Sequence, residues 1–280
     1  MIKVGLDLGN SKISCIVCDI KINSKPKILS FVSLPTSNIN KNNFINFKKI
    51  KSEVQEIINI SAGESQTEIK SINLTVPLIS SESIYYNSQI LIDSELITDL
   101  HIKKAINQST FFDQVINKKI LMNYILNYQV DQNIIFNSPV GNYANILDLS
   151  FYKLLIDQNI LSTYENLFND LNIHIENFVP KPLASALATL NKDDQDLGGV
   201  CIDLGNSSTS IALFENNTLI FCDSINIGST NITNDIARGI STTKESAERL
   251  KTLYGSVFSN PSDEHEIIDV PILGSDNNQL

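Results

Sequence analysis

The pentapeptide Asp7-Leu8-Gly9-Asn10-Ser11 recurs, letter for letter, as Asp203-Leu204-Gly205-Asn206-Ser207. Apolar segments flank both copies, at 2–6, 13–18, 199–202 and 210–214. This pattern of strand, polar turn and strand predicts a β-hairpin with glycine in its turn. Two copies of one hairpin predict two related lobes, with a cleft where the two turns meet.

Length and charge limit the classes of protein to consider. A chain of 280 residues is long enough for two domains, each with its own core. With 21 Lys and Arg against 31 Asp and Glu, the net charge is −10, which argues against a nucleic-acid partner.

The cysteines and the apolar runs narrow the classes further. Four cysteines are too few for a disulfide scaffold. Cys15 and Cys18 resemble a CxxC motif, but their odd spacing within an apparent strand places them on opposite faces, so core thiols are the better interpretation. The three histidines are scattered without metal-ligand spacing. No signal-peptide core and no apolar run of about 18 residues is present, which predicts a cytosolic chain.

The first 80 residues predict a mixed sheet with a crossover helix. After the first hairpin, strands are expected at 27–34 and 69–76. Apolar residues spaced at helical intervals predict a helix over 47–60 between them. This β-β-β-α-β order is typical of a mixed-sheet unit.

Residues 80–157 have a different order of expected strands and helices, which predicts a small α+β insertion. A strand at 84–92 leads to Ser94, an expected N-cap for a helix over 95–108. Further expected elements are strands at 120–130 and 146–156 with a turn at 137–141 between them. The charged residues of the insertion are dispersed, so contact with another protein is its expected task.

The rest of the chain alternates helices and strands. Before the second hairpin we expect a helix at 159–171, a strand at 173–179, a small-residue helix at 182–188 that starts with Pro182, and a loop at 191–196. After it we expect a strand at 218–225, helices at 231–238 and 243–254, and a short strand at 267–272 in a polar tail.

The repeated turn has the chemistry needed for phosphate. Backbone N–H groups and short hydroxyl side chains donate well to phosphate oxygens. The Asp before each Gly would repel phosphate, so its expected role is to hold Mg²⁺ through water. Lys12 adds a positive charge suited to the β- or γ-phosphate.

The twin turns, with the Ala-rich segment 181–190 ahead of the second, resemble the actin-like ATPase superfamily of actin, the large heat-shock chaperones and the sugar kinases. This resemblance implies an α/β, actin-like (ribonuclease H-like) two-lobe fold with a small α+β insertion in the first lobe. It also implies ATP and Mg²⁺ as ligands.

Further motifs resemble FtsA, the cell-division family of that superfamily. Asn137-Ser138-Pro139-Val140-Gly141 is similar to its N-P-[VI]-G turn, and the insertion begins where that family carries its own 1C subdomain. Ala247-Glu248-Arg249-Leu250-Lys251-Thr252-Leu253-Tyr254-Gly255 is similar to its AE-x-[IL]-K-x-x-[YH]-G helix. The implied division is 1–79 with 158–192 as the first large lobe, 80–157 as the inserted subdomain, 193–229 as the second large lobe, and 230–280 as an outer part that we expect to be truncated.

The resemblance assigns binding residues to both turns. The first phosphate loop would be Asp7, Gly9, Asn10, Ser11 and Lys12, and the second Asp203, Gly205, Asn206, Ser207 and Ser208, with Gly228 in the turn that follows. Asp7 and Asp203 would be the Mg²⁺ carboxylates. Glu248 and Lys251, on one helix face, would reach the ribose and base, and the other interpretation of this pair is a surface salt bridge.

The chain departs from the family at two places. Asn206 and Ser207 replace two glycines of the usual second loop, where bulk or a positive φ would weaken nucleotide binding. Lys181 stands where hydrolytic relatives carry the Glu or Gln that orients water, and an ammonium cannot accept a proton. We therefore expect weak or no ATPase activity and no confident catalytic residue.

The expected function is that of an FtsA-like protein that binds ATP, self-assembles and links FtsZ to the membrane and to later division proteins. The insertion 80–157 would contact those proteins, and membrane binding would need a C-terminal helix beyond Leu280. The expected place is the cytoplasmic face of the inner membrane at the division site. One alternative is a PilM-like pilus-assembly protein that binds a short peptide. The other is a sugar or acetate kinase, which would need a carboxylate cluster that residues 80–157 lack.

Overall fold

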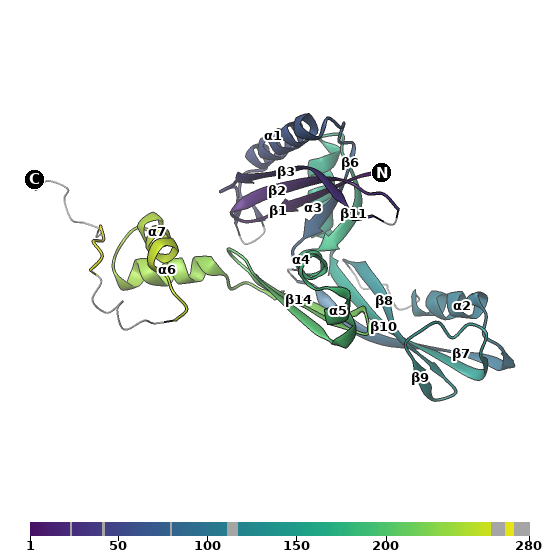
Figure 1. The fold of residues 1–280 in the computed structure, drawn as a ribbon. Coiled ribbons are helices and arrows are strands. Elements are labelled where there is room, and N and C mark those ends of the chain that lie inside the picture. The colour runs from purple at the N-terminus through teal and green to yellow at the C-terminus, as the bar shows by residue number, and fades with distance from the viewer. Residues whose placement is uncertain (23, 41–42, 79, 111–116, 259–266, 272–280) are drawn as a thin grey trace, which may run out of the picture. The chain divides into compact units, whose positions relative to one another are not determined.

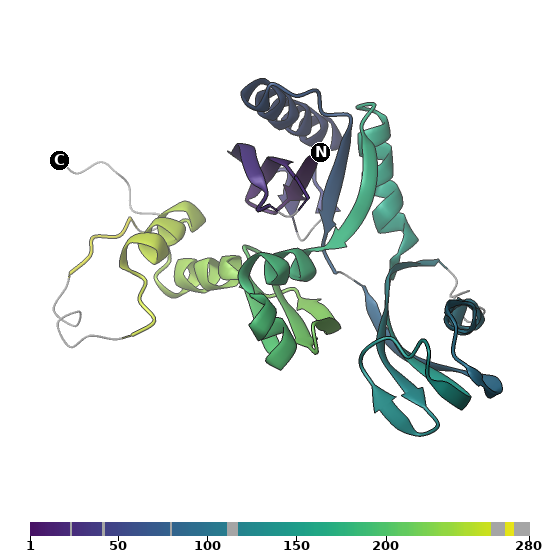
Figure 2. The ribbon, with the colours of Figure 1, turned by 45° about the vertical axis from the view of Figure 1, so that its right-hand side comes forward.

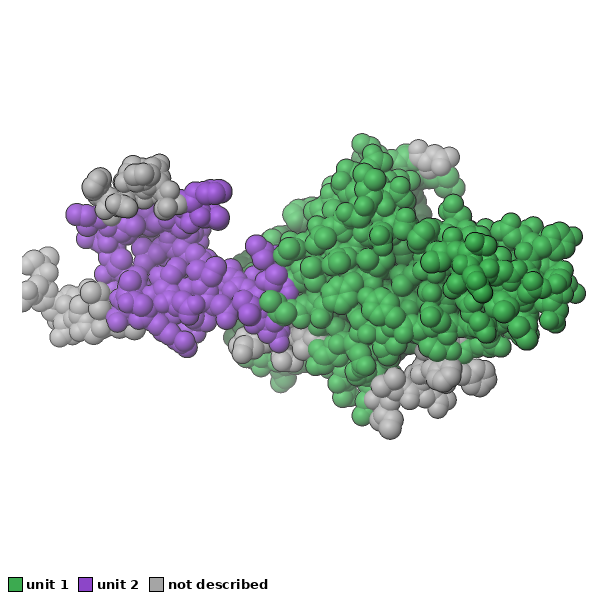
Figure 3. Space-filling view, turned by 90° about the horizontal axis from the view of Figure 1, so that it is seen from below, with its two compact units in different colours: residues 1–203, 210–225 green, residues 204–209, 226–280 purple. Residues whose placement is uncertain are grey.

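The computed structural model describes residues 1–280 except 23, 41–42, 79, 111–116, 259–266 and 272–280. Contacts divide the chain into two compact units. Unit 1 comprises residues 1–203 and 210–225, and unit 2 comprises residues 204–209 and 226–280 (Figure 3). The four-part lobe division of the sequence analysis stays a prediction.

The centre of unit 1 is a five-stranded mixed sheet (Figure 1). In spatial order its strands are β11 (His174–Pro180), β6 (Ser71–Val76), β1 (Ile2–Leu8), β2 (Lys12–Asp19) and β3 (Lys27–Pro35). β11, β6 and β1 run parallel, whereas β1, β2 and β3 form an antiparallel meander. The first repeated turn therefore leaves the carboxyl end of the central strand β1 and joins it to β2, which is the predicted hairpin.

Two helices complete the core of this sheet. Alternate residues of β1, β2 and β6 are buried in one apolar cluster with α1 (Phe47–Ser65) and α3 (Gln158–Asn169). α1 lies against β2 and β3 (Figure 1; Figure 2). Cys15 is buried in this cluster and Cys18 is only half-buried, which confirms their opposite orientations. A two-stranded ribbon of β4 (Ile39–Asn40) and β5 (Asn43–Phe44) before α1 was not predicted.

The segment predicted as an insertion forms its own four-stranded sheet. Its order is β7 (Glu82–Leu96), β10 (Tyr143–Asp157), β8 (Lys118–Val130) and β9 (Asn133–Ile135), with α2 (Asp99–Thr110) following β7. The predicted N-cap at Ser94 is wrong. Ser94 has φ +63° within β7 and donates to Asn145 Oδ1 of β10 at 2.5 Å, so pairing with β10 extends the strand past it.

The second repeated hairpin belongs to a three-stranded sheet. Its strands, in order, are β12 (Gly199–Leu204), β13 (Thr209–Glu215) and β14 (Thr218–Ile225). One face packs on α4 (Lys181–Thr189), because Ala212, Phe214 and Leu219 share a buried cluster with Leu183 and Ala186. The loop predicted at 191–196 is instead a short helix, α5 (Lys192–Leu197). Asn191 and Asp194 cap it reciprocally, a capping box that the acidic composition concealed.

Unit 2 holds the second turn and two helices, α6 (Ser229–Gly239) and α7 (Lys244–Tyr254). Both helices begin within two residues of the predicted positions. Residues 267–271 form no strand, which corrects the strand predicted at 267–272, and residue 272 lies outside the described residues. Within the described ranges, no helix is both long and apolar enough to span a bilayer.

Candidate functional site

The two repeated turns have the same backbone geometry. The amide of Gly9 donates to the carbonyl oxygen of Lys12 at 3.0 Å, and the amide of Gly205 donates to the carbonyl oxygen of Ser208 at 2.9 Å. Donor and acceptor are three residues apart in both cases. Identical sequence has thus produced the same closed turn twice, which confirms the predicted hairpins.

Close approach of the backbone explains the glycine in each turn. A Cβ built on Gly9 would lie 2.8 Å from the oxygen of Lys12, and one built on Gly205 would lie 2.8 Å from that of Ser208. Neither distance is sterically acceptable for a real side chain. Neither Asn206 nor Ser207 has a positive φ, so the backbone strain anticipated at these two positions is not present.

Asp7, at the end of β1, is held from two sides. Its Oδ1 accepts a hydrogen bond from Thr75 Oγ1 of β6 at 2.5 Å. Its Oδ2 lies 3.3 Å from Nζ of Lys181, the first residue of α4. The side chains of Asp7 and Lys181 retain 28% and 32% exposure, so the ion pair is accessible to solvent and to a ligand.

The same helix also holds the carboxylate of the second copy. Ser185 Oγ donates to Asp203 Oδ2 at 2.7 Å. Lys181 and Ser185 are four residues apart on α4 and therefore lie on one face in successive turns. The structure thus brings Asp7 and Asp203 to neighbouring positions along a single helix within unit 1.

In unit 2 the second turn caps α6. The carbonyl oxygens of Gly205 and Asn206 accept from the amides of Ser229 and Thr230 at 3.0 and 2.8 Å. A Cβ on Gly228 would lie 2.6 Å from the oxygen of Asn206, so only glycine permits this approach. The amide of Gly228 donates to Asn231 Oδ1 at 3.0 Å, and its predicted contact with a nucleotide stays a prediction.

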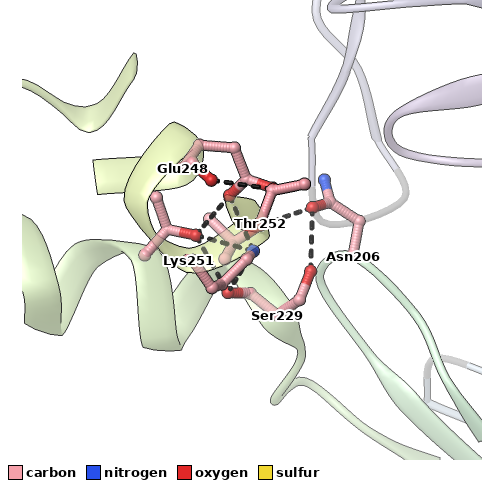
Figure 4. A network of polar contacts seen from close by, with 7 residues as sticks. Asn206, Ser229, Glu248, Lys251 and Thr252 are labelled. Atoms are coloured by element: carbon pink, nitrogen blue, oxygen red, sulfur yellow. Dashed lines mark hydrogen bonds and ion pairs between the residues drawn. The ribbon is translucent and has the colours of Figure 1, made fainter. Parts of the chain in front are cut away.

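A polar network links this turn to α7 (Figure 4). Asn206 Oδ1 accepts hydrogen bonds from Ser229 Oγ and Thr230 Oγ1. Lys251 Nζ donates to the backbone carbonyl oxygen of Ser229 at 3.3 Å. Lys251 also pairs with Glu248 at 2.6 Å. Hydrogen bonds from Lys251 and from Thr233 lower the pKa of Glu248 below its ordinary value.

The network bears on the second interpretation of the Glu248–Lys251 pair. The two side chains form the salt bridge that this interpretation anticipates, and they share a helix face. Lys251 is only 18% exposed whereas Glu248 is 52% exposed, so the lysine is enclosed and the carboxylate remains open to solvent. The role of these residues toward ribose and base stays a prediction.

The residues around Asp7 fit Mg²⁺ poorly. A hydrated cation beside this carboxylate would compete with the Lys181 ammonium for the same place. Because Mg²⁺ carries two positive charges and the ammonium one, the two cations would repel each other at this carboxylate.

Sequence reasoning missed the partners of these carboxylates. Thr75 comes from a strand 68 residues away from Asp7, and no local pattern signals their contact. Ser185 offered a weak signal, because it lies in the predicted helix 182–188, four residues after Lys181, which the structure makes the first residue of α4. Thr233 of α6, which donates to Glu248 at 2.5 Å, likewise required the packing of two helices.

The sequence of this chain is similar to those of known cell-division proteins. The family model described as "Cell division protein FtsA" matches residues 200–279. FtsA of Rhizobium meliloti (strain 1021) is 29% identical over 220 residues, covering 79% of this chain and 46% of the relative. FtsA of Bacillus subtilis (strain 168) is 39% identical over 107 residues, covering 38% of this chain and 24% of the relative. The chain thus spans about half the length of the Rhizobium relative.

Solved structures resemble this chain in fold. The PilM–PilN type IV pilus biogenesis complex aligns with a TM-score of 0.63 at 16% identity, covering 90% of this chain and 70% of the other. The ethanolamine utilization protein EutJ of Carboxydothermus hydrogenoformans aligns with a TM-score of 0.51 at 13% identity, covering 90% and 61%. These likenesses support the predicted fold class. The chain is therefore similar in sequence to the cell-division protein FtsA, and its fold is similar to that of PilM and EutJ, as the predicted actin-like fold requires.

Proposed function

We propose that this chain binds ATP and acts in bacterial cell division as an FtsA-like protein. The sequence similarity to FtsA supports the division role, and the repeated turns support nucleotide binding. The exposed Ser11 and Lys12 of the first turn and the ammonium group of Lys181 would bind the phosphate oxygens.

One observation carries the proposal. Asp7 and Asp203, the equivalent residues of two copies of one hairpin, each contact α4, at Lys181 and Ser185. Carboxylates that only ended two unrelated hairpins would have no reason to reach successive turns of one helix. A polyphosphate ligand beside Asp7 gives such a reason, because the ammonium of Lys181 on α4 can offset the charge of that carboxylate and also donate to phosphate.

The finer elements of the function follow from the resemblance to FtsA. We expect ATP-dependent self-assembly, binding of FtsZ, contacts of residues 80–157 with other division proteins, and association with the inner membrane at the division site. ATP hydrolysis is expected to be slow, because Lys181 cannot accept a proton from the attacking water. The nucleotide would then act mainly as a structural ligand or as a switch for assembly.

ATP binding is tested by titration of the purified chain with a fluorescent ATP analogue. We expect saturable binding that the Lys12→Gln substitution weakens about tenfold, because a charged hydrogen bond to phosphate is lost. Lys192→Gln is the matched control, since Lys192 is also an exposed lysine of unit 1 but lies on α5. Equal affinities of the two variants, or absence of binding, would contradict the proposal.

The division role is tested by co-sedimentation with FtsZ polymers. We expect a larger fraction of the protein to pellet when FtsZ polymers and ATP are both present than when ATP alone is present, since self-assembly by itself sediments part of the protein. Capture by a PilN-type peptide in place of FtsZ would favour the pilus-assembly alternative, whose fold likeness has been described.

A further inference from the structure

We propose that the ammonium group of Lys181 takes the place of Mg²⁺ at the first turn, so that this chain binds the polyphosphate of ATP without a divalent metal ion. The inference rests on the proposed ATP binding and concerns the cation that accompanies the nucleotide.

The backbone holds Lys181 firmly at this position. Lys181 is the first residue of α4 and stands between Pro180 and Pro182. Pro180 is buried and pairs with Val76 in the register of β11 and β6. Two flanking prolines restrict the backbone on both sides, so the Cα atom of Lys181 is fixed relative to the central sheet.

The ammonium lies over the first turn. Nζ of Lys181 is 3.3 Å from Asp7 Oδ2 and 3.8 Å from the position that a Cβ atom on Gly9 would take. The side chain of Lys181 is partly exposed to solvent, at 32%. A ligand at the turn can therefore reach it.

An ammonium in this place can perform both electrostatic tasks of a resident metal ion. It has three donors, so it can stay bonded to Asp7 while it donates to a phosphate oxygen. It also offsets the charge of the carboxylate, which would otherwise repel the phosphates. Mg²⁺ would serve the same purpose through its bound waters, because it keeps several waters and contacts one or two carboxylates.

The second carboxylate, Asp203, also has a hydrogen-bond partner on α4. Asp203 Oδ2 accepts a hydrogen bond from Ser185 Oγ at 2.7 Å, one turn further along α4. Both carboxylates that would have been metal ligands are therefore bound to side chains of one helix. At Asp7 the metal would have to displace a built-in cation, whereas at Asp203 it would meet a neutral hydroxyl.

A purely structural ion pair between Lys181 and Asp7 would have different consequences. It would leave the metal requirement of ATP binding unchanged when the lysine is replaced. The proposal instead predicts that loss of the ammonium creates a requirement for Mg²⁺. The two interpretations are separated by the ratio of ATP affinities with and without the metal ion.

The experiment measures equilibrium binding of the fluorescent ATP analogue in excess EDTA and in excess Mg²⁺. For the unmodified chain we expect affinities that agree within about threefold. For Lys181→Gln we expect the affinity in EDTA to fall roughly tenfold or more, in the range expected for a lost charge-assisted hydrogen bond, and to be restored in part by Mg²⁺. Lys181→Arg, which keeps the charge, should remain independent of Mg²⁺, and so should Lys192→Gln.

The outcomes separate this inference from the proposed function. Binding of ATP by the unmodified chain only in Mg²⁺ would overturn the inference and leave the proposed function standing. Binding in neither buffer would overturn both. An equal loss of affinity by Lys181→Gln in both buffers would also overturn the inference, because the lysine would then add to the metal ion instead of replacing it. Circular dichroism of each variant shows whether it is folded.

Discussion

At the scale of single residues, close backbone contact selects glycine at some positions, and a left-handed backbone selects glycine or asparagine at others. Gly9 and Gly205 are required because a Cβ atom would collide with a carbonyl oxygen of the same turn. Their φ angles are not positive. Elsewhere the left-handed region is occupied by Asn residues such as Asn172 and Asn216, which tolerate it. The glycines of the repeat therefore reflect contact distance and not backbone handedness.

A pair of alanine substitutions tests this explanation. Gly9→Ala should lower the free energy of unfolding by about 1–3 kcal/mol, because the turn must open to accommodate the methyl group. Gly63→Ala, in α1, has open space around its Cβ position and should stabilise the protein by roughly 0.5–1 kcal/mol. Urea denaturation measures both. A Gly9→Ala protein as stable as the parent would refute the steric explanation.

At the scale of elements, β10 connects three buried clusters. Ile156 lies in the core of the five-stranded sheet, Tyr152 and Leu154 lie against α4 and β14, and Leu147 and Phe151 lie in the core of the four-stranded sheet. Residues 151–156 are all buried. The alternation of buried and exposed side chains, usual in a strand with one face in solvent, is therefore absent there. A single long strand thus ties the predicted insertion to the rest of unit 1.

The Tyr152 hydroxyl tests this connection. It accepts from the amide of Cys222 on β14 at 3.0 Å and contacts Ser83 Oγ on β7 at 3.0 Å, and burial raises the pKa of Tyr152. Tyr152→Phe should cost about 1–3 kcal/mol, because a buried amide loses its partner. Tyr85→Phe is the matched control. The exposed Tyr85 hydroxyl donates to the carbonyl oxygen of Ile220, and water can take its place in the variant. The free energy of unfolding should therefore change by no more than about 0.5 kcal/mol. Equal losses in urea denaturation would contradict this account.

At the scale of the whole molecule, the two sheets that carry the repeated hairpins differ in the pairing of the strand that precedes the turn. In the five-stranded sheet β1 is paired on both sides, by β6 and by β2. In the three-stranded sheet β12 is at the edge, and Val200 and Ile202 on it are 56% and 60% exposed. An exposed apolar edge strand favours association with other chains.

Polar substitution of this strand should reduce that association. The double substitution Val200→Thr and Ile202→Thr keeps β-branched side chains but makes the exposed surface polar. We expect less self-association in light scattering at equal concentration, with a melting temperature close to that of the parent. Unchanged scattering would show that β12 does not mediate association of the chain.

The accuracy of the sequence-based predictions differs between local and long-range features. The hairpins, the helix of small residues at α4 and the strand β14 follow from local patterns, and the structure confirms them. The start of α2 was placed too early because pairing with β10 overrode the cap signal at Ser94. α5 was missed because its charged residues mask a capping box.

By itself, the sequence determined that one hairpin occurs twice, because identical residues impose the same local turn wherever they stand. It also determined the α/β class, through alternating and helical apolar periods. Only the tertiary structure decided that Asp7 and Asp203 both contact α4 and that Lys181 lies against Asp7. The physical reason is that these contacts join segments far apart along the chain, and their geometry depends on how the sheets and α4 pack.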